Sequence, residues 1–430
     1  MVRRVEVLVA AVVLLIAALS TGAQFLYFLV YLGIIVVGGS YVVTRFGLAD
    51  LEAGYVLDRL HAQAGDMLRA NYTVRNTSRL PKLWLEVHNP TTLPVSLPGE
   101  AITIGPRGER SWSVRVPLTR RGHFRVDPMA LRTGDPLGLF ESNAAVGGYS
   151  TVIVYPRVEP LPGWRMPPAF IEGSHAERVQ TPHNTPEVTS IREYVPGDGY
   201  NRIHWKSSAR QGQLLVKEFE LEQTADVWIF LDLDTATHTG TGDESTLEYG
   251  VRVAASIAAR ALTENRKVAL TASGAHVAPV PADRGPRQYQ KIMQTLAAVM
   301  ADGDQPLSEV LVENATRLRR GMTAVIITAS LDARWVRPLS GLRRRNVQTA
   351  IILLDALAFA SFGQAPDEST AARAALGDAR PLHDEDQRTL RAVRHALAEH
   401  DLRFVSVEPG EPLGTQLVTR GPRPVLVASR

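Results

Sequence analysis

The sequence predicts an α/β doubly wound domain, preceded by a small antiparallel β-sandwich and by a two-helix transmembrane hairpin. Two long apolar runs open the chain, short alternating runs between turn residues follow, and from Asp226 onward buried strands alternate with helices. A chain of 430 residues is also too long for one ordinary domain. The predicted parts are residues 1–48 (hairpin), 49–160 (sandwich), 161–225 (linker and signature segment) and 226–430 (α/β domain).

The transmembrane hairpin is predicted from two apolar runs with only a short polar turn between them. Val5–Gly22 is apolar apart from Glu6, Ser20 and Thr21, and Phe25–Val43 carries no charge. About 18 residues at ~1.5 Å each reach roughly 27 Å, close to the ~30 Å hydrocarbon core of a bilayer. Two such spans with so short a link must form an antiparallel pair.

Basic residues predict the orientation of this hairpin. Arg3 and Arg4 precede the first run, Arg45 follows the second, and the turn between them has none. The positive-inside rule therefore places both ends, and the soluble domains, in the cytoplasm. The alternative is a cleaved signal peptide, since Thr21–Ala23 resembles a cleavage site. Even then, the second run would remain as one span.

The sandwich is predicted between Leu51 and Pro160 from short runs that alternate apolar and polar residues and are separated by Asn, Ser, Pro and Gly. Strands at this spacing are typical of a small antiparallel sandwich. The clearest are Leu68–Val74, Leu83–Val87, Trp112–Val116 and Thr151–Tyr155.

The α/β domain is predicted from strands without alternation, which indicates burial on both faces, and from helices with one apolar stripe. Val227–Leu233 is the first such strand, and Thr246–Glu264 is the first helix. Further strands are expected at Lys267–Ala272, Ala324–Thr328, Val347–Leu354 and Arg403–Val407, and further helices at Gln288–Met300, Leu331–Arg345 and Leu390–His400. Gly363–Arg380, rich in Ala, Gly, Asp and Ser, is interpreted as a flexible insertion. This order is typical of a doubly wound sheet with helices on both faces.

Composition and missing motifs exclude several functions. The chain has no cysteine, so disulfides, thiol nucleophiles and cysteine-held metals are excluded. Its 47 basic and 44 acidic residues form no long basic run, which gives no case for nucleic-acid binding. It has no GxxxxGK[ST], no GxGxxG after a strand, no HExxH and no GxSxG. A doubly wound sheet without these signatures favours a non-catalytic binding module.

Residues 192–210 form the most distinctive segment, here called the signature segment. It places a Pro-Gly-Asp-Gly turn among charged and aromatic residues, in which Asp198 can pair with Arg192 or Arg202 and Trp205 can stack under a guanidinium. It is interpreted either as a clasp between domains or as a partner-binding surface. The residues concerned are Arg192, Tyr194, Asp198, Arg202, Trp205, Lys206 and Arg210.

The motifs REYVPGD, RIHWKSSAR and LLVKEFE, with RRGHF at residues 120–124 and DPLGLF at residues 135–140, resemble domain-of-unknown-function family fifty-eight (DUF58). The resemblance implies a von Willebrand factor A-like domain after the signature segment. It also implies an adaptor that works with a MoxR-type AAA+ ATPase in a chaperone-like or cell-envelope system.

A von Willebrand factor A-like domain would hold Mg²⁺ through an Asp-x-Ser-x-Ser loop and further oxygen ligands. The corresponding loop here is Asp232-Leu233-Asp234-Thr235-Ala236, in which Asp234 replaces the first serine and Ala236 offers no ligand. Thr237 and Thr246 are both possible hydroxyl ligands, and Thr328-Ala329-Ser330 with Asp332, after a later strand, leave the third ligand open. The resemblance therefore implies a degenerate metal site at Asp232, Asp234 and Thr246.

The leading hypothesis from the sequence is a membrane-anchored, non-catalytic adaptor or scaffold that docks a cytoplasmic partner beside Asp232 and Asp234. One alternative is a metal-dependent hydrolase that uses these two carboxylates and a histidine from elsewhere. The other is a purely structural protein of the cell envelope.

Overall fold

The computed structural model describes residues 2–164, 188–195, 200, 203–219, 226–275, 277–362 and 382–418. The chain divides into two compact units, Met1–Val158 with Met293–Val299 and Glu159–Ile292 with Met300–Arg430. The predicted insertion at 363–380 and more than half of the predicted linker and signature segment at 161–225 lie outside the described residues.

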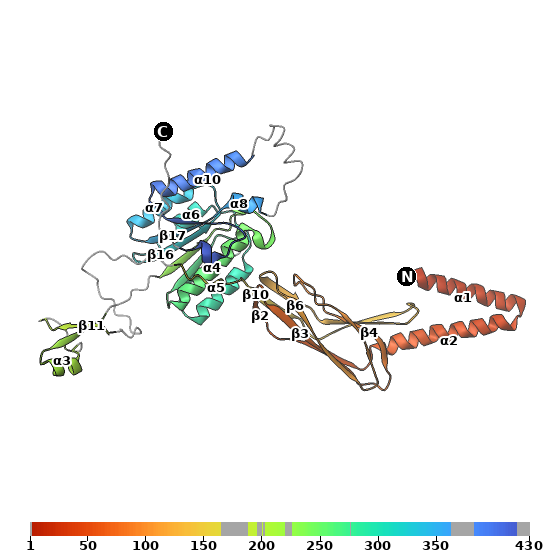
Figure 1. Ribbon diagram of the computed structural model, residues 1–430. Helices are drawn as coiled ribbons and strands as arrows, with labels where there is room; N and C mark the ends of the chain where they lie inside the picture. Colours follow the sequence, from red (N-terminus) through yellow and green to blue (C-terminus); the bar gives the residue numbers. More distant parts are fainter. Residues whose placement is uncertain are drawn as a thin grey trace. The chain divides into compact units, whose positions relative to one another are not determined.

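Two helices open the chain, α1 (Val2–Thr21) and α2 (Gln24–Gly47), and they contact one another (Figure 1). Gly22 turns the chain between them with φ +69°, a conformation that costs glycine little. Helix α2 is long and apolar enough to cross a membrane, whereas the apolar part of α1, Val9–Thr21, is shorter. An apolar N-terminal helix is thus confirmed, and a second membrane span stays a prediction.

Ten strands follow in the first unit and enclose one apolar core. They pair as β1-β3-β6, as β5-β4-β8-β9 and as β2-β10-β7, and all pairs are antiparallel apart from β2 with β10. Burial alternates residue by residue along β3, as the period of two in its sequence predicts. The strands are β1 (Leu51–Leu57), β2 (His61–Gln63), β3 (Met67–Asn76), β4 (Lys82–His88), β5 (Glu100–Ile104), β6 (Glu109–Pro117), β7 (Gly122–Val126), β8 (Met129–Gly134), β9 (Glu141–Val146) and β10 (Ser150–Tyr155).

The signature segment contributes to a small element of two strands and a short helix. Strands β11 (Val188–Glu193) and β12 (Leu215–Phe219) pair antiparallel, and α3 (Trp205–Gln211) lies between them in the chain. His204 caps α3, because its Nδ1 accepts a hydrogen bond from the Ser207 N–H at 3.1 Å, and Gly212 ends the helix with φ +68°. The alternation of Leu215, Lys217 and Phe219 in the sequence predicts β12, whereas neither β11 nor α3 was predicted.

A six-stranded sheet forms the centre of the second unit, in the order β15-β14-β13-β16-β17-β18. All neighbours are parallel except β14 and β15. Numbered along the chain this order is 3-2-1-4-5-6, a doubly wound order. The strands are β13 (Val227–Leu231), β14 (Val268–Ala272), β15 (Val280–Asp283), β16 (Thr323–Thr328), β17 (Gln348–Leu354) and β18 (Phe404–Val407).

Helices cover both faces of this sheet (Figure 1). Alternate strand residues such as Phe230, Ile326 and Leu353 pack against α6, α7 and α10. On the other face, α4 lies close to the strands at Gly250. A Cβ at this position would lie only 3.2 Å from the Leu231 side chain, so the small glycine permits the close approach. The helices are α4 (Thr246–Thr263), α5 (Pro286–Ala298), α6 (Leu307–Asn314), α7 (Val336–Arg344), α8 (Ala356–Ser361), α10 (Leu382–Glu399) and α11 (Leu413–Gln416).

Several boundaries differ from the predicted ones. The helix expected from Leu331 is a short 3-10 helix (Ala333–Trp335) followed by α7, because the Asp332 side chain accepts the Arg334 N–H and caps the turn. The helix expected from Leu390 begins at Leu382. Strand β15 and helix α6 were not predicted, because four and eight residues give too little periodicity to recognise.

Candidate functional site

A cavity of about 320 Å³ lies at the carboxyl end of the six-stranded sheet. It opens between the loops that follow β13 and β16, the neighbouring strands at which the strand order reverses. Doubly wound sheets usually bind their ligands at this position. The lining residues that matter below are Asp234, Thr237, Ser330, Asp332, Arg334 and Trp335.

Asp232 directly follows β13 and is buried beneath this edge. Its Oδ2 accepts the Thr328 hydroxyl at 2.6 Å, and its Oδ1 accepts the Asp234 N–H at 3.2 Å. Burial raises the pKa of Asp232 to about 6, although these two hydrogen bonds oppose the rise. The carboxyl group therefore joins the end of β13 to the end of β16.

Asp234 is half-buried and lines the cavity. Its Oδ1 accepts the Ala236 N–H at 3.0 Å and so caps a 3-10 helix, η2 (Thr235–Thr237). The loop after β13 is thus organised by two aspartates: Asp232 holds the end of β16, its neighbour in the sheet, and Asp234 holds the turn.

Thr246, the first residue of α4, is fully buried. Its Oγ1 accepts the Thr239 N–H at 2.9 Å and lies 3.1 Å from His238 Nδ1. His238 Nε2 lies 3.1 Å from the main-chain oxygen of Asp232. Since that oxygen can only accept, Nε2 carries the proton, and the Thr246 hydroxyl also contacts the main-chain oxygen of Thr239 at 3.2 Å. His238, which the sequence did not single out, thereby links Thr246 to the main chain of Asp232.

The three predicted ligands, Asp232, Asp234 and Thr246, lie near one another in the structure but do not fit a Mg²⁺ site. Both oxygens of Asp232 accept hydrogen bonds, Asp234 caps a turn, and the Thr246 hydroxyl contacts His238 and Thr239. Within the described ranges, no three His, Cys, Asp or Glu side chains form a metal-holding group. Ala236 supplies no side-chain oxygen, and the oxygens of Asp232 and Thr246 already hold the loop together, so the set offers Mg²⁺ too few ligands.

The rim of the cavity carries an exposed ion pair. Arg334 Nε lies 2.6 Å from Asp332 Oδ2, whereas Trp335 beside them is fully buried. None of the described residues that line the cavity is a histidine, cysteine or lysine. A rim of charge, hydroxyls within and an apolar wall are common features of ligand-binding sites.

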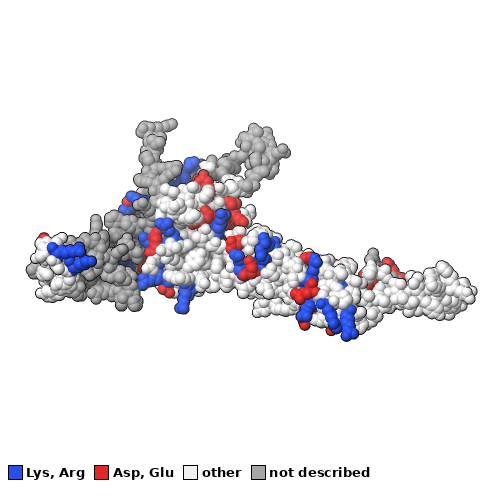
Figure 2. Space-filling view, turned by 60° about the horizontal axis from the view of Figure 1, so that its bottom comes forward, with Lys and Arg blue, Asp and Glu red and all other residues white. Residues whose placement is uncertain are grey.

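The predicted signature residues lie only in part within the described chain. Tyr194 stacks on Tyr200 with ring centroids 6.2 Å apart. Trp205, Lys206 and Arg210 are exposed on α3, and basic side chains are visible on this element in Figure 2. Arg192 lies in β11 opposite Val216, its side chain is not among those described, and Asp198 and Arg202 lie outside the described residues.

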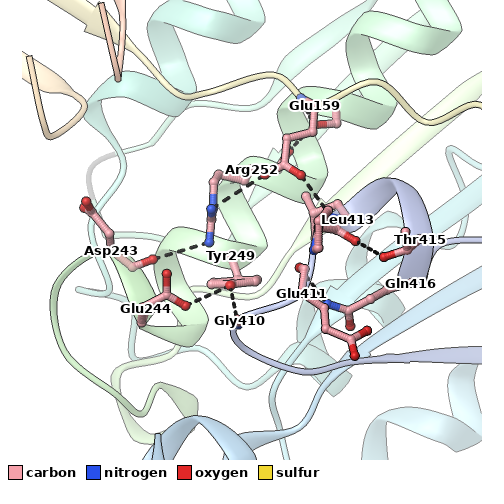
Figure 3. Close-up of polar contacts among 12 residues, drawn as sticks. Glu159, Asp243, Glu244, Tyr249, Arg252, Gly410, Glu411, Leu413, Thr415 and Gln416 are labelled. Atoms are coloured by element: carbon pink, nitrogen blue, oxygen red, sulfur yellow. Dashed lines mark hydrogen bonds and ion pairs between the residues drawn. The ribbon is translucent and has the colours of Figure 1, made fainter. Parts of the chain in front are cut away.

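A second polar cluster ties the entry of the second unit to its C-terminal end (Figure 3). Glu159 forms an ion pair with Arg252 at 3.6 Å, and its other carboxylate oxygen accepts the Leu413 N–H at 3.0 Å. The Arg252 guanidinium lies 3.8 Å from the centre of the Tyr249 ring. The Tyr249 hydroxyl donates to Glu244 at 2.8 Å and accepts the Gly410 N–H at 2.9 Å. Since these contacts join residues 159, 244–252 and 410–413 to one another, the cluster is a structural clasp.

The signature segment and the cavity both lie within one family match. The protein-family model described as "Protein of unknown function DUF58" matches residues 190–359, from β11 to α8. The resemblance noted in the sequence is confirmed over these residues.

The most informative relatives are bacterial. The uncharacterized protein YeaD of Bacillus subtilis is 25% identical over 317 residues, which are 71% of this chain and 75% of YeaD. The uncharacterized protein Rv1480 of Mycobacterium tuberculosis is 29% identical over 192 residues, 43% of this chain and 59% of that protein. Among solved structures, a CARDB domain from Pyrococcus furiosus has 14% identity and a TM-score of 0.19 over 24% of this chain and 94% of its own. A TM-score this low supports no inference.

Proposed function

We propose that the protein is a membrane-anchored, non-catalytic adaptor that docks a cytoplasmic protein in the cavity at the carboxyl edge of its sheet. The cavity at the point where the strand order reverses is the observation that carries this proposal. Anchoring rests on α2, which is long and apolar enough to span a bilayer. We further propose that α1 crosses beside it, with both chain ends in the cytoplasm as the basic flanks predict.

The size and lining of the cavity favour a protein ligand. A volume of about 320 Å³ is at the small end of ligand pockets and suits a few anchoring side chains of a partner loop. The ion pair of Asp332 and Arg334 on the rim offers charges of both signs. The DUF58 resemblance suggests a MoxR-type AAA+ ATPase as this partner.

The strand order 3-2-1-4-5-6 with an antiparallel strand at one edge supports a von Willebrand factor A-like reading of the second unit. Because the donor set at Asp232, Asp234 and Thr246 does not fit Mg²⁺, we propose that docking is independent of a cation. The same misfit removes the support for a metal-dependent hydrolase.

Affinity capture would test the docking site. Full-length protein in detergent would be incubated with a purified MoxR-type ATPase from the same cells, with and without a chelator. Asp332→Ala combined with Arg334→Ala should weaken binding at least about tenfold, or about 1.4 kcal/mol, whereas the chelator should have no effect. Undiminished binding by this variant would refute the cavity as the docking site.

The chain offers a matched control at an ion pair away from the cavity. Arg343 and Asp401 are exposed and lie 2.7 Å apart, and neither lines the cavity. Replacing both with alanine removes the same charges and should leave binding unchanged. Failure of the wild type to bind any such ATPase would instead favour a structural role in the cell envelope.

A further inference from the structure

The last two turns of α2 have an unusual distribution of side chains. Ser40 and Thr44 are buried against the protein and only 7% and 4% exposed. Val42, Val43 and Phe46, by contrast, are exposed, and Phe46 is 50% exposed. A helix that packs on a domain in water buries its apolar side chains and exposes its polar ones. The reversed arrangement indicates that the outer face of α2 is surrounded by lipid at this level.

The loop between β8 and β9, residues 135–140, packs on α2 at the same level. Ser40 is hydrogen-bonded through its side chain to Asp135, and the rings of Tyr41 and Phe140 make an edge contact with centroids 5.7 Å apart. This loop is the DPLGLF motif noted in the sequence, which the docking cavity does not use.

Two further contacts hold α2 against the strands beside this loop. Lys82 Nζ donates to the main-chain oxygen of Phe46 at 2.7 Å and so caps the helix C-terminus. A Cβ at Gly47 would lie 2.6 Å from the Thr133 methyl group, so this contact requires glycine. The height of the loop along α2 is therefore fixed.

The length of α2 places this contact at the edge of a bilayer. Its 24 residues, Gln24–Gly47, span about 36 Å, which exceeds a hydrocarbon core of about 30 Å. Ser40 lies 16 residues after Gln24, or about 24 Å along the axis. If the core begins at Gln24, it ends near Val43, beyond the level at which the loop packs.

The loop itself suits an environment with little water. The buried carboxylate of Asp135 accepts the Phe140 N–H at 2.6 Å and the Leu137 N–H at 2.9 Å, in addition to the contact with Ser40. Leu137, near the tip, is 48% exposed. An apolar tip above a carboxylate that needs no water is what an interfacial segment requires.

The neighbouring strand adds a second apolar element. A register shift in β4 between Lys82 and Leu85 leaves Leu83 and Trp84 exposed next to each other. The Thr133 hydroxyl donates to the main-chain oxygen of Trp84 at 2.7 Å, so this pair lies beside the start of the loop. Tryptophan is enriched at membrane–water interfaces.

We propose that the loop Asp135–Phe140, together with Leu83 and Trp84, is embedded in the lipid interface beside α2. The first unit would then rest on the bilayer rather than hang from a flexible tether. This inference depends on the membrane anchoring proposed above but not on the docking of a partner.

Site-directed spin labelling would test the proposal in the full-length protein. The chain has no cysteine, so single cysteines can be introduced without background. Leu137→Cys probes the loop, Ile34→Cys probes the exposed middle of α2, and Tyr149→Cys is an exposed control beyond the other end of β9. The labelled proteins would be reconstituted into vesicles of phosphatidylcholine and phosphatidylglycerol, and collisions with oxygen and with a water-soluble nickel chelate compared.

The expected ratio of oxygen to nickel collisions is highest at Ile34→Cys, intermediate at Leu137→Cys and lowest at Tyr149→Cys, with at least a threefold difference between the last two. A Leu137→Cys ratio equal to that of Tyr149→Cys, with Ile34→Cys in lipid, would overturn the embedding and leave the anchor intact. Few collisions with either reagent at Leu137→Cys, with spin–spin broadening, would overturn it in favour of a second copy of the chain. A water-exposed Ile34→Cys would overturn the anchoring and the embedding together.

Discussion

Replacing Asp232 with asparagine should stabilise the carboxyl edge of the six-stranded sheet at neutral pH. The carboxyl group has a pKa of about 6 in the folded protein, against 3.8 for an exposed aspartate, because burial disfavours its ionised form. The folded state therefore binds more protons than the unfolded state between about pH 4 and pH 6. The free energy of unfolding falls as pH rises through this window and stays lower above it.

The size of this effect follows from the shift. A difference of about 2 pKa units corresponds to about 3 kcal/mol lost between pH 4 and neutral pH. Asparagine keeps the shape and can still accept the Asp234 N–H and donate to the Thr328 hydroxyl oxygen. The amide forms weaker hydrogen bonds than the ionised carboxylate, which reduces the gain. We therefore expect the variant's free energy of unfolding to exceed that of the wild type by about 2 kcal/mol at pH 7.5 and by almost nothing at pH 4.

Hydrogen–deuterium exchange of peptides from β13 and β16 would measure this change in the full-length protein in detergent. Comparing variant and wild type at the same pH cancels the intrinsic exchange rate, and the variant should open about thirtyfold less often at pH 7.5. Asp355→Asn is the matched control, because Asp355 also follows a buried strand but forms an ion pair with Arg394 at 3.0 Å. Neutralising Asp355 should therefore destabilise the protein. Faster exchange in Asp232→Asn than in wild type at pH 7.5 would refute the reasoning.

Two further substitutions test contacts that each lie within one unit. Glu159→Gln leaves the Arg252 guanidinium without its anionic partner and should destabilise the segment around Leu413 by about 1.5–3 kcal/mol, seen as faster exchange there; unchanged exchange would show that the clasp has no energetic role. Lys82→Met removes the hydrogen bond to the C-terminal oxygen of α2 but keeps most of the apolar stem, and should loosen the last turn of α2 by about 1 kcal/mol. Exchange of residues 44–48 would measure this, and a more protected last turn would contradict the capping role.

The elements that could be predicted have a burial pattern that repeats along the chain. β3 alternates because one face lies on a core, and Val227–Leu231 is continuously apolar because helices cover both of its faces. The stripe on α4 was recognised for the same reason. Strand β15 and helix α3 were missed because short elements are stabilised by their neighbours and not by local periodicity.

For the candidate site, the sequence by itself determined which side chains follow β13 and that Ala236 cannot hold a cation. It could not determine that Asp232 accepts the Thr328 hydroxyl, since these residues are 96 positions apart and meet only because β13 and β16 pair in parallel. The same pairing opens the cavity, and burial beneath it raises the pKa of Asp232. Tertiary structure thus decided the chemistry of the site, because hydrogen-bond partners and desolvation depend on residues far apart in the chain.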